Sequence, residues 1–165
     1  MPDHAVILLV EDLEDDILLI RRAFQQAQLV NPLHVVRDGE EAIAYLSGQG
    51  QYANRTEHPI PDLILLDLKM PKMDGFEVLE WIRSQPETRG IAVVVLTSSD
   101  QLRDVNRAYV LGANSFLVKP LEFLNYVDLS ALLRQYWMQT VKLPASFRPP
   151  PARAETKPDP ESPPR

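Results

Sequence analysis

Short runs of aliphatic residues alternate along this chain with longer segments in which apolar residues recur every three or four positions. The aliphatic runs predict buried strands at residues 5–10, 33–36, 63–66, 91–96 and 115–118. The periodic segments predict helices at residues 14–28, 39–46, 75–84, 102–111 and from about 121 to 140. Because alternating strands and helices need crossover connections, the pattern predicts an α/β fold in which helices cover both faces of a parallel sheet.

Polar residues stand at the ends of four of these predicted strands. Glu11 and Asp12 follow the first strand, Asp67 follows the third, Thr97 the fourth and Lys119 the fifth. Since ligands of open parallel sheets bind at the carboxyl ends of the strands, these side chains are expected to converge on one edge. Each residue alone has an ordinary explanation, as a helix cap, a strand end or a solvated charge. Three acids, a hydroxyl and a lysine together favour a functional site.

The chemistry of this set indicates a magnesium-dependent phosphoryl site. Three carboxylates held close together repel one another unless a cation neutralises them. Oxygen donors of this kind suit Mg²⁺, which binds one or two carboxylates together with phosphate oxygens. Lys119 and Thr97 suit the oxygens of a transferring phosphoryl group, and Asp67 is the candidate nucleophile that becomes an aspartyl phosphate.

Two alternative functions, an aspartate-dependent phosphatase or phosphotransferase and a nucleotide-binding protein, fit the sequence less well. Phosphatases and phosphotransferases with an aspartate nucleophile carry a second acid two residues later, where this chain has Lys69. A nucleotide-binding site needs a glycine-rich phosphate loop after the first strand, but residues 11–14 read Glu-Asp-Leu-Glu.

Composition narrows the class of protein further. The 165 residues suffice for one domain with a substantial core, and the formal net charge of −6 argues against a nucleic acid partner. The chain has no cysteine, which indicates a reducing cytoplasm, and no apolar stretch approaches the roughly 18 residues that span a membrane. Residues 144–165 hold eight of the 15 prolines, so we predict one domain over residues 1–143 followed by a disordered tail.

Four motifs resemble those of response-regulator receiver domains, of the single-domain kind typified by the bacterial chemotaxis regulator. They are Leu-Val-Glu-Asp at 9–12, Leu-Leu-Asp-Leu-Lys-Met-Pro-Lys-Met-Asp-Gly at 65–75, Leu-Thr-Ser at 96–98 and Gly-Ala-Asn-Ser-Phe-Leu-Val-Lys-Pro at 112–120. The resemblance covers about residues 4–140. It implies a doubly wound, flavodoxin-like sheet of five strands in the order 2-1-3-4-5 with five helices. It also implies a signalling switch of a two-component system and not a turnover enzyme.

The resemblance assigns roles to the acidic residues. Asp67 would accept a phosphoryl group from a phosphohistidine on a partner histidine kinase. Asp12, Asp67 and the backbone carbonyl of Lys69 would bind Mg²⁺ directly, and Glu11 would act through water. The family often has aspartate where this chain has Glu11, which has a longer arm.

The resemblance also implies a conformational switch. Lys119 would pair with the phosphoryl oxygens and be joined to Pro120 by a cis peptide bond. Thr97 would move toward the phosphoryl group, and Phe116 would follow into the space that Thr97 vacates. Many relatives have tyrosine at the position of Phe116, so this chain keeps the packing change but lacks the hydroxyl.

The output is expected to be a surface, because the sequence indicates no effector domain. The expected surface consists of the fourth helix, the fifth strand and the fifth helix, and the apolar residues on more than one side of the last helix predict a homodimer there. Residues 48–61 resemble a loop in small regulators of phytochrome-type histidine kinases; a loop without a functional role is the alternative. A receiver-like interaction module that works without phosphate is the alternative function, and the complete acidic set favours the switch.

Overall fold

The computed structural model describes residues 4–144, which form a parallel sheet in the order β2-β1-β3-β4-β5. The strands are β1 (Ile7–Val10), β2 (Leu33–Val36), β3 (Leu63–Leu66), β4 (Ala92–Thr97) and β5 (Ser115–Val118). The helices are α1 (Glu14–Gln26), α2 (Gly39–Ser47), α3 (Gly75–Ser84), α4 (Leu102–Val110) and α5 (Phe123–Leu133), with a 3-10 turn η2 (Gly50–Tyr52) and a π-helical segment η3 (Arg134–Thr140). The predicted fold class and the strand order are confirmed.

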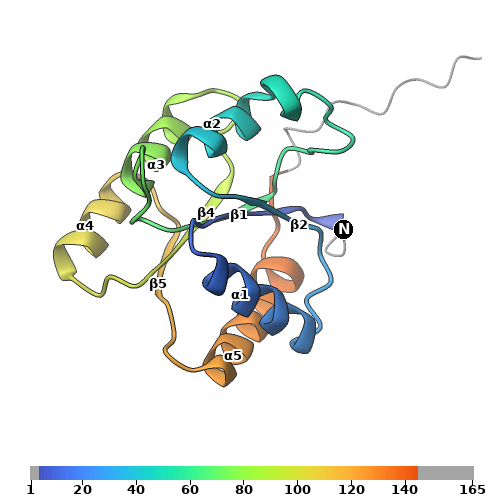
Figure 1. The fold of residues 1–165 in the computed structure, drawn as a ribbon, viewed down its shortest axis with the longest axis vertical. Coiled ribbons are helices and arrows are strands. Elements are labelled where there is room, and N and C mark those ends of the chain that lie inside the picture. Colours follow the sequence, from blue (N-terminus) through green and yellow to red (C-terminus); the bar gives the residue numbers. More distant parts are fainter. Residues whose placement is uncertain (1–3, 145–165) are drawn as a thin grey trace, which may run out of the picture.

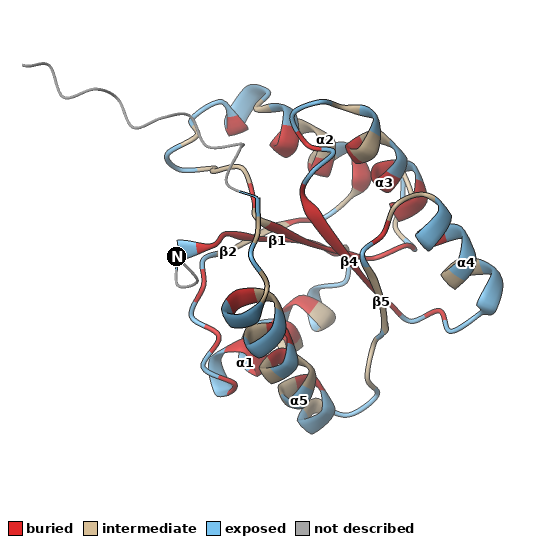
Figure 2. Cartoon of the chain, turned by 180° about the vertical axis from the view of Figure 1, so that it is seen from behind, coloured by how far each residue is buried: buried red, intermediate tan, exposed pale blue. Residues whose placement is uncertain are grey.

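Helices cover both faces of the sheet. Helices α1 and α5 lie on one face, and α2, α3 and α4 lie on the other (Figure 1). Two apolar clusters fill the layers between sheet and helices, and every residue of β1, β3 and β4 is buried (Figure 2). A central parallel strand is enclosed by helices on both sides, which explains why these runs are almost wholly aliphatic.

Local signals in the sequence set where two of the helices begin. The carboxylates of Asp38 and Asp74 accept hydrogen bonds from the backbone N–H groups of Glu41 and Glu77, so these aspartates cap α2 and α3. Helix α4 is followed by Gly112, whose positive φ of 103° is a conformation that favours glycine. The expected end of this helix at Gly112 is therefore confirmed.

Two expectations differ from the structure at or after the fifth strand, and a third concerns residues that lie almost wholly outside the described part of the chain. The helix predicted to reach residue 140 ends at Leu133 and continues as η3, where the Val141 N–H and the Thr140 hydroxyl each donate to a carbonyl five residues back. The described residues contain no cis peptide bond, so the cis expectation for Lys119–Pro120 is wrong here; the trans form is the intrinsically favoured one, by about 0.5–1 kcal/mol. The predicted tail lies, apart from Pro144, outside the described residues.

Within residues 4–144, no helix combines the length and the apolar character that crossing a membrane requires.

Gly75 fixes how closely α3 approaches the end of β3. A Cβ atom at this position would lie 2.2 Å from the carbonyl oxygen of Asp67 and 2.7 Å from the Cα of Leu68. The Gly75 N–H also donates to the Leu68 carbonyl at 3.0 Å. Because the obstructing atoms are backbone, no side-chain rotation makes room for a larger residue.

We predict that Gly75→Ala lowers the free energy of unfolding by about 2 kcal/mol, since the added methyl group forces the backbone beside Asp67 to move. Urea denaturation followed by circular dichroism measures the change. The control is Glu80→Ala, on an exposed position of the same helix, which is expected to leave stability nearly unchanged. Equal midpoints for the two variants would contradict the close-approach argument.

Candidate functional site

Polar residues stand at four strand ends along one edge of the sheet, and the side chains from β1, β3 and β5 come together there. Glu11 and Asp12 directly follow β1, Asp67 follows β3, Thr97 ends β4 and Lys119 follows β5. The ladder explains the convergence, because Val10 pairs with Leu66, and Leu66 pairs with Val95. All these strands therefore end at nearly the same level.

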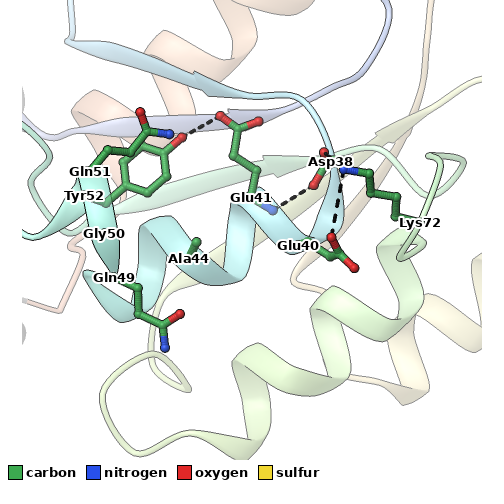
Figure 3. Close-up of a pocket in the computed structure, with 9 residues that line it drawn as sticks. All are labelled: Asp38, Glu40, Glu41, Ala44, Gln49, Gly50, Gln51, Tyr52 and Lys72. Atoms are coloured by element: carbon green, nitrogen blue, oxygen red, sulfur yellow. Dashed lines mark hydrogen bonds and ion pairs between the residues drawn. The ribbon is translucent and has the colours of Figure 1, made fainter.

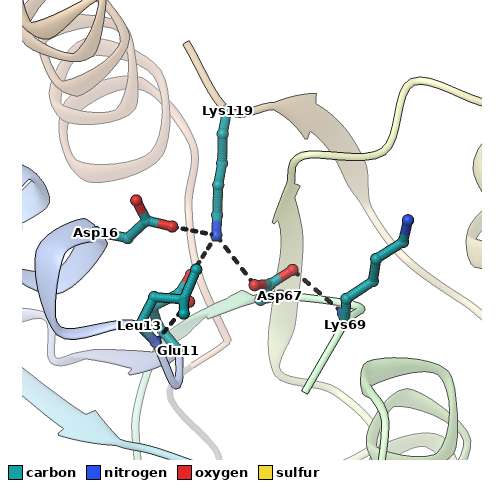
Figure 4. A network of polar contacts seen from close by, with 6 residues as sticks. All are labelled: Glu11, Leu13, Asp16, Asp67, Lys69 and Lys119. Carbon is teal, nitrogen blue, oxygen red and sulfur yellow. Dashed lines mark hydrogen bonds and ion pairs between the residues drawn. The ribbon is translucent and has the colours of Figure 1, made fainter. Parts of the chain in front are cut away.

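Lys119 is the centre of this group. Its ammonium nitrogen lies 2.6 Å from Glu11 Oε2, 2.7 Å from Asp16 Oδ2 and 3.0 Å from Asp67 Oδ2 (Figure 4). An ammonium group has three N–H donors, and these three carboxylates can engage all of them. The Lys119 side chain is only 7% exposed, so the charge is held inside the protein by these partners.

The acidic residues themselves could hold a divalent cation. Glu11, Asp12 and Asp67 each offer a carboxylate oxygen, and these oxygens all lie within 4.8 Å of one another. In the described part of the chain, the buried Oδ1 of Asp12 has no hydrogen-bond partner. A buried carboxylate oxygen without a donor is costly unless a cation satisfies it, so the donor set fits a hard metal ion such as Mg²⁺.

Burial and charge shift the pKa values at this site in a consistent way. Burial raises the pKa of Glu11 from 4.5 to about 7, although the hydrogen bond from Lys119 acts in the opposite direction. Burial alone would lower the pKa of Lys119, but hydrogen bonds to Asp16 and Glu11 outweigh it and the net shift is upward. Lys119 is therefore a permanent cation, whereas Glu11 changes protonation near neutral pH.

The two residues of the expected switch lie on one face of the sheet. Phe116 pairs with Val95, and Val118 pairs with Thr97, two positions further along both strands. Side chains two residues apart in a strand share a face, so Thr97 and Phe116 both point toward the layer that contains α4. Thr97 is fully buried, and its hydroxyl has no hydrogen-bond partner among residues 4–144.

Lys69 contributes its backbone to the site and not its side chain. Its N–H donates to Asp67 Oδ1 at 3.2 Å, which orients the carboxylate. Its exposed side chain extends away from the acidic group (Figure 4).

Asp16 belongs to the site but was not among the predicted residues. It lies in the first turn of α1, where acidic residues are common because they interact favourably with the helix dipole. Because of that ordinary explanation, the sequence alone does not indicate that Asp16 contributes to the site. The available signal is its spacing, four residues after Asp12 and within reach of the same edge.

The connection at residues 48–61 is an ordered structure with its own contacts. The Arg55 guanidinium donates to the carbonyls of Tyr45 and Leu46 at 2.7 and 2.8 Å, which satisfies the end of α2. The Tyr52 hydroxyl donates to Glu41 at 2.5 Å across a surface pocket of about 620 Å³ (Figure 3). None of the residues lining this pocket belongs to the acidic group around Asp67.

Comparison with known proteins identifies the family. Residues 7–130 match the model of the response regulator receiver domain. Response regulator Rcp1 of Synechocystis sp. is 40% identical over 86% of this chain and 94% of its own length. The crystal structure of the phosphorylated cyanobacterial phytochrome response regulator RcpA is also 40% identical, with a TM-score of 0.80 over 86% of this chain and 99% of that one.

A second crystal structure, the Mn²⁺-bound form of Rcp1, has a TM-score of 0.78 at 40% identity over the same shares of the two chains. Family match, strand order and the acidic edge agree. This chain belongs to the response regulator receiver domain family, whose members work as phosphorylation switches in two-component signalling.

Proposed function

We propose that Asp67 is the phosphoacceptor of this receiver domain. The observation that supports the proposal is the position of its carboxylate: it is 4% exposed, it lies 3.0 Å from the Lys119 ammonium, and it is grouped with Glu11 and Asp12. A carboxylate oxygen of Asp67 would attack the phosphorus of a phosphohistidine. The P–N bond breaks as the new P–O bond forms, and the released imidazole takes up a proton.

The other residues of the site would bind and stabilise the phosphoryl group. Lys119 would neutralise charge on its oxygens, and the unpartnered Thr97 hydroxyl would donate a hydrogen bond to it. The Lys69 N–H, already directed at Asp67, would keep the carboxylate oriented.

Asp12, Asp67 and the Lys69 carbonyl are the proposed direct ligands of Mg²⁺, with Glu11 acting through water. The orphan oxygen of Asp12 and the Mn²⁺-bound form of Rcp1 support a divalent cation here. When bound, the ion would offset the charge of the acids and of the incoming phosphoryl group.

The proposed phosphoryl donor is a histidine kinase of the phytochrome type, in the cytoplasm. The support is the similarity to RcpA, whose structure is described as that of a phytochrome response regulator. The complete acidic group argues against a module that works without phosphate, because such a module has no need for the site.

The proposed output is a change on the surface formed by α4, β5 and α5. Movement of Thr97 would open space for Phe116 on the face that packs against α4. The loop before α4 is coupled to that helix, since the Ser99 hydroxyl donates to Asp104 at 2.5 Å. A few kcal/mol between the two conformers would allow phosphorylation to shift their populations.

We also propose that this surface joins two copies of the chain. Large apolar side chains are exposed on all three parts of it; they include Leu102 and Val110 of α4, Val118 of β5, and Leu124 and Leu132 of α5. Many exposed apolar side chains on neighbouring elements are unfavourable in water and favour association. A twofold interface would use the same face on both copies.

Incubation with Mg²⁺ and acetyl phosphate is expected to add one phosphoryl group to the wild-type chain and none to Asp67→Asn, because the amide is not a nucleophile. Intact-mass spectrometry measures the product. Asp62→Asn is the control for loss of one carboxylate, since Asp62 lies just before β3 at the opposite end of the strand. Phosphate on the Asp67 variant would contradict the assignment.

Lys119→Met is expected to lower the free energy of unfolding by about 3 kcal/mol at pH 8 without metal, because buried carboxylates lose their cation. Glu11 has a pKa of about 7 in the folded chain, above its value of 4.5 when unfolded, so its contribution to stability falls as pH rises between these values. Removing the ammonium raises that pKa further, and the loss is therefore larger at pH 8 than at pH 5.

Urea denaturation at the two pH values measures this loss. Lys69→Met is the control, because it removes one exposed lysine beside the same site and is expected to change stability little at either pH. A loss for Lys119→Met that is the same at pH 5 and pH 8 would contradict the electrostatic argument.

Sedimentation equilibrium is expected to give a dimer that becomes tighter with Mg²⁺ and beryllofluoride, which mimics the phosphoryl group. Leu124→Arg, on exposed α5 surface, is expected to give a monomer, because a charge would be buried at the interface. Val30→Arg, at an exposed position after α1, is the control. A wild-type monomer at high micromolar concentration, with and without the mimic, would exclude the dimer.

A further inference from the structure

Asp16 is a fourth carboxylate at the site and differs from the other three. Its Oδ2 accepts from the Lys119 ammonium at 2.7 Å, and its side chain is 21% exposed. It lies on α1, whereas Glu11, Asp12 and Asp67 follow strands and form the group that could hold a metal ion. Asp16 is therefore bound to the lysine without belonging to that group.

Lys119 and a divalent cation compete for the same carboxylates. Two of the three Lys119 contacts are to Glu11 and Asp67, at 2.6 and 3.0 Å. A cation bound by these residues would draw their oxygens away from the ammonium and repel it. The phosphoryl chemistry nevertheless needs both positive charges at Asp67 at the same time.

We propose that Asp16 is a positioning residue that retains Lys119 when Glu11 and Asp67 turn to the divalent cation. Its carboxylate keeps a hydrogen bond to the ammonium when the ion takes over the carboxylates of Glu11 and Asp67. Lys119 therefore stays beside Asp67, and the ion binds more tightly. This inference rests on the proposed function and specifies how one site accommodates two kinds of cation.

The neighbouring residue Asp15 separates this role from a general effect of acidic charge. Both aspartates lie in the first turn of α1, so each removes the same charge from the same helix end when it is changed to asparagine. Asp15 is exposed, and the interactions of Lys119 in the described structure do not include it. Asp15→Asn is accordingly the matched control.

The test is a Mg²⁺ titration of the full chain followed by amide NMR shifts. Asp16→Asn is expected to weaken Mg²⁺ binding by about fivefold or more relative to Asp15→Asn, because Lys119 then remains on Glu11 and Asp67. Circular dichroism confirms that both variants are folded. Equal dissociation constants for the two variants would overturn the proposal.

The same titration in a Lys119→Met background shows whether Asp16 acts through the lysine. With the ammonium removed, Asp16→Asn and Asp15→Asn are expected to have equal effects on Mg²⁺ binding. A difference that persists in this background would mean that Asp16 acts on the ion directly, and it too would overturn the proposal.

Failure of the role proposed for Asp16 can be distinguished from failure of the role proposed for Asp67. A wild-type chain that is phosphorylated on Asp67, with Asp16→Asn indistinguishable from Asp15→Asn in the titration, refutes the role of Asp16 and leaves the phosphoacceptor intact. A chain that takes no phosphate, but in which Asp16→Asn weakens Mg²⁺ binding as expected, supports the role of Asp16 and refutes Asp67 as the phosphoacceptor.

Discussion

The confinement of three carboxylates around one ammonium group is the constraint on which this structure depends. Lys119 is nearly buried, and Glu11 and Asp67 have even less exposure to water. Like charges this close are tolerated only with a cation among them, and the ammonium provides it. The arrangement has an electrostatic cost that a divalent ion can relieve, which makes the site responsive to such an ion.

The fold brings these charges together through the order and register of its parallel strands. Parallel strands that end at the same level place residues from distant parts of the sequence side by side, and the tight packing of α3 at Gly75 fixes the backbone next to Asp67. The same ladder places Thr97 and Phe116 on one face. Charge at the edge and packing under α4 are thus connected through two adjacent strands.

Much of this arrangement could be predicted from the sequence, for identifiable reasons. The buried strands are nearly pure aliphatic runs, and the carboxyl ends of parallel strands must share an edge, so Asp67 and Lys119 could be brought together from their positions alone. Asp16 could not, because an acid in the first turn of a helix already has an ordinary explanation. The π-helical turn after Leu133 also escaped prediction, since its apolar spacing continues that of α5. The homodimer and the disordered tail at residues 144–165 stay predictions.

The contacts of Arg55 have a consequence for any exchange of segments between regulators. This side chain reinforces the end of α2 at Gly48, since it donates to carbonyls in the last turn of the helix. The Tyr45 hydroxyl in return donates to the carbonyl of Pro59. Residues 48–61 and α2 are consequently held to each other from both sides, and a chimera that transplants residues 48–61 alone would carry Arg55 with it but not the Tyr45 hydroxyl that donates to the Pro59 carbonyl. A graft that preserves these contacts has to begin upstream, within α2.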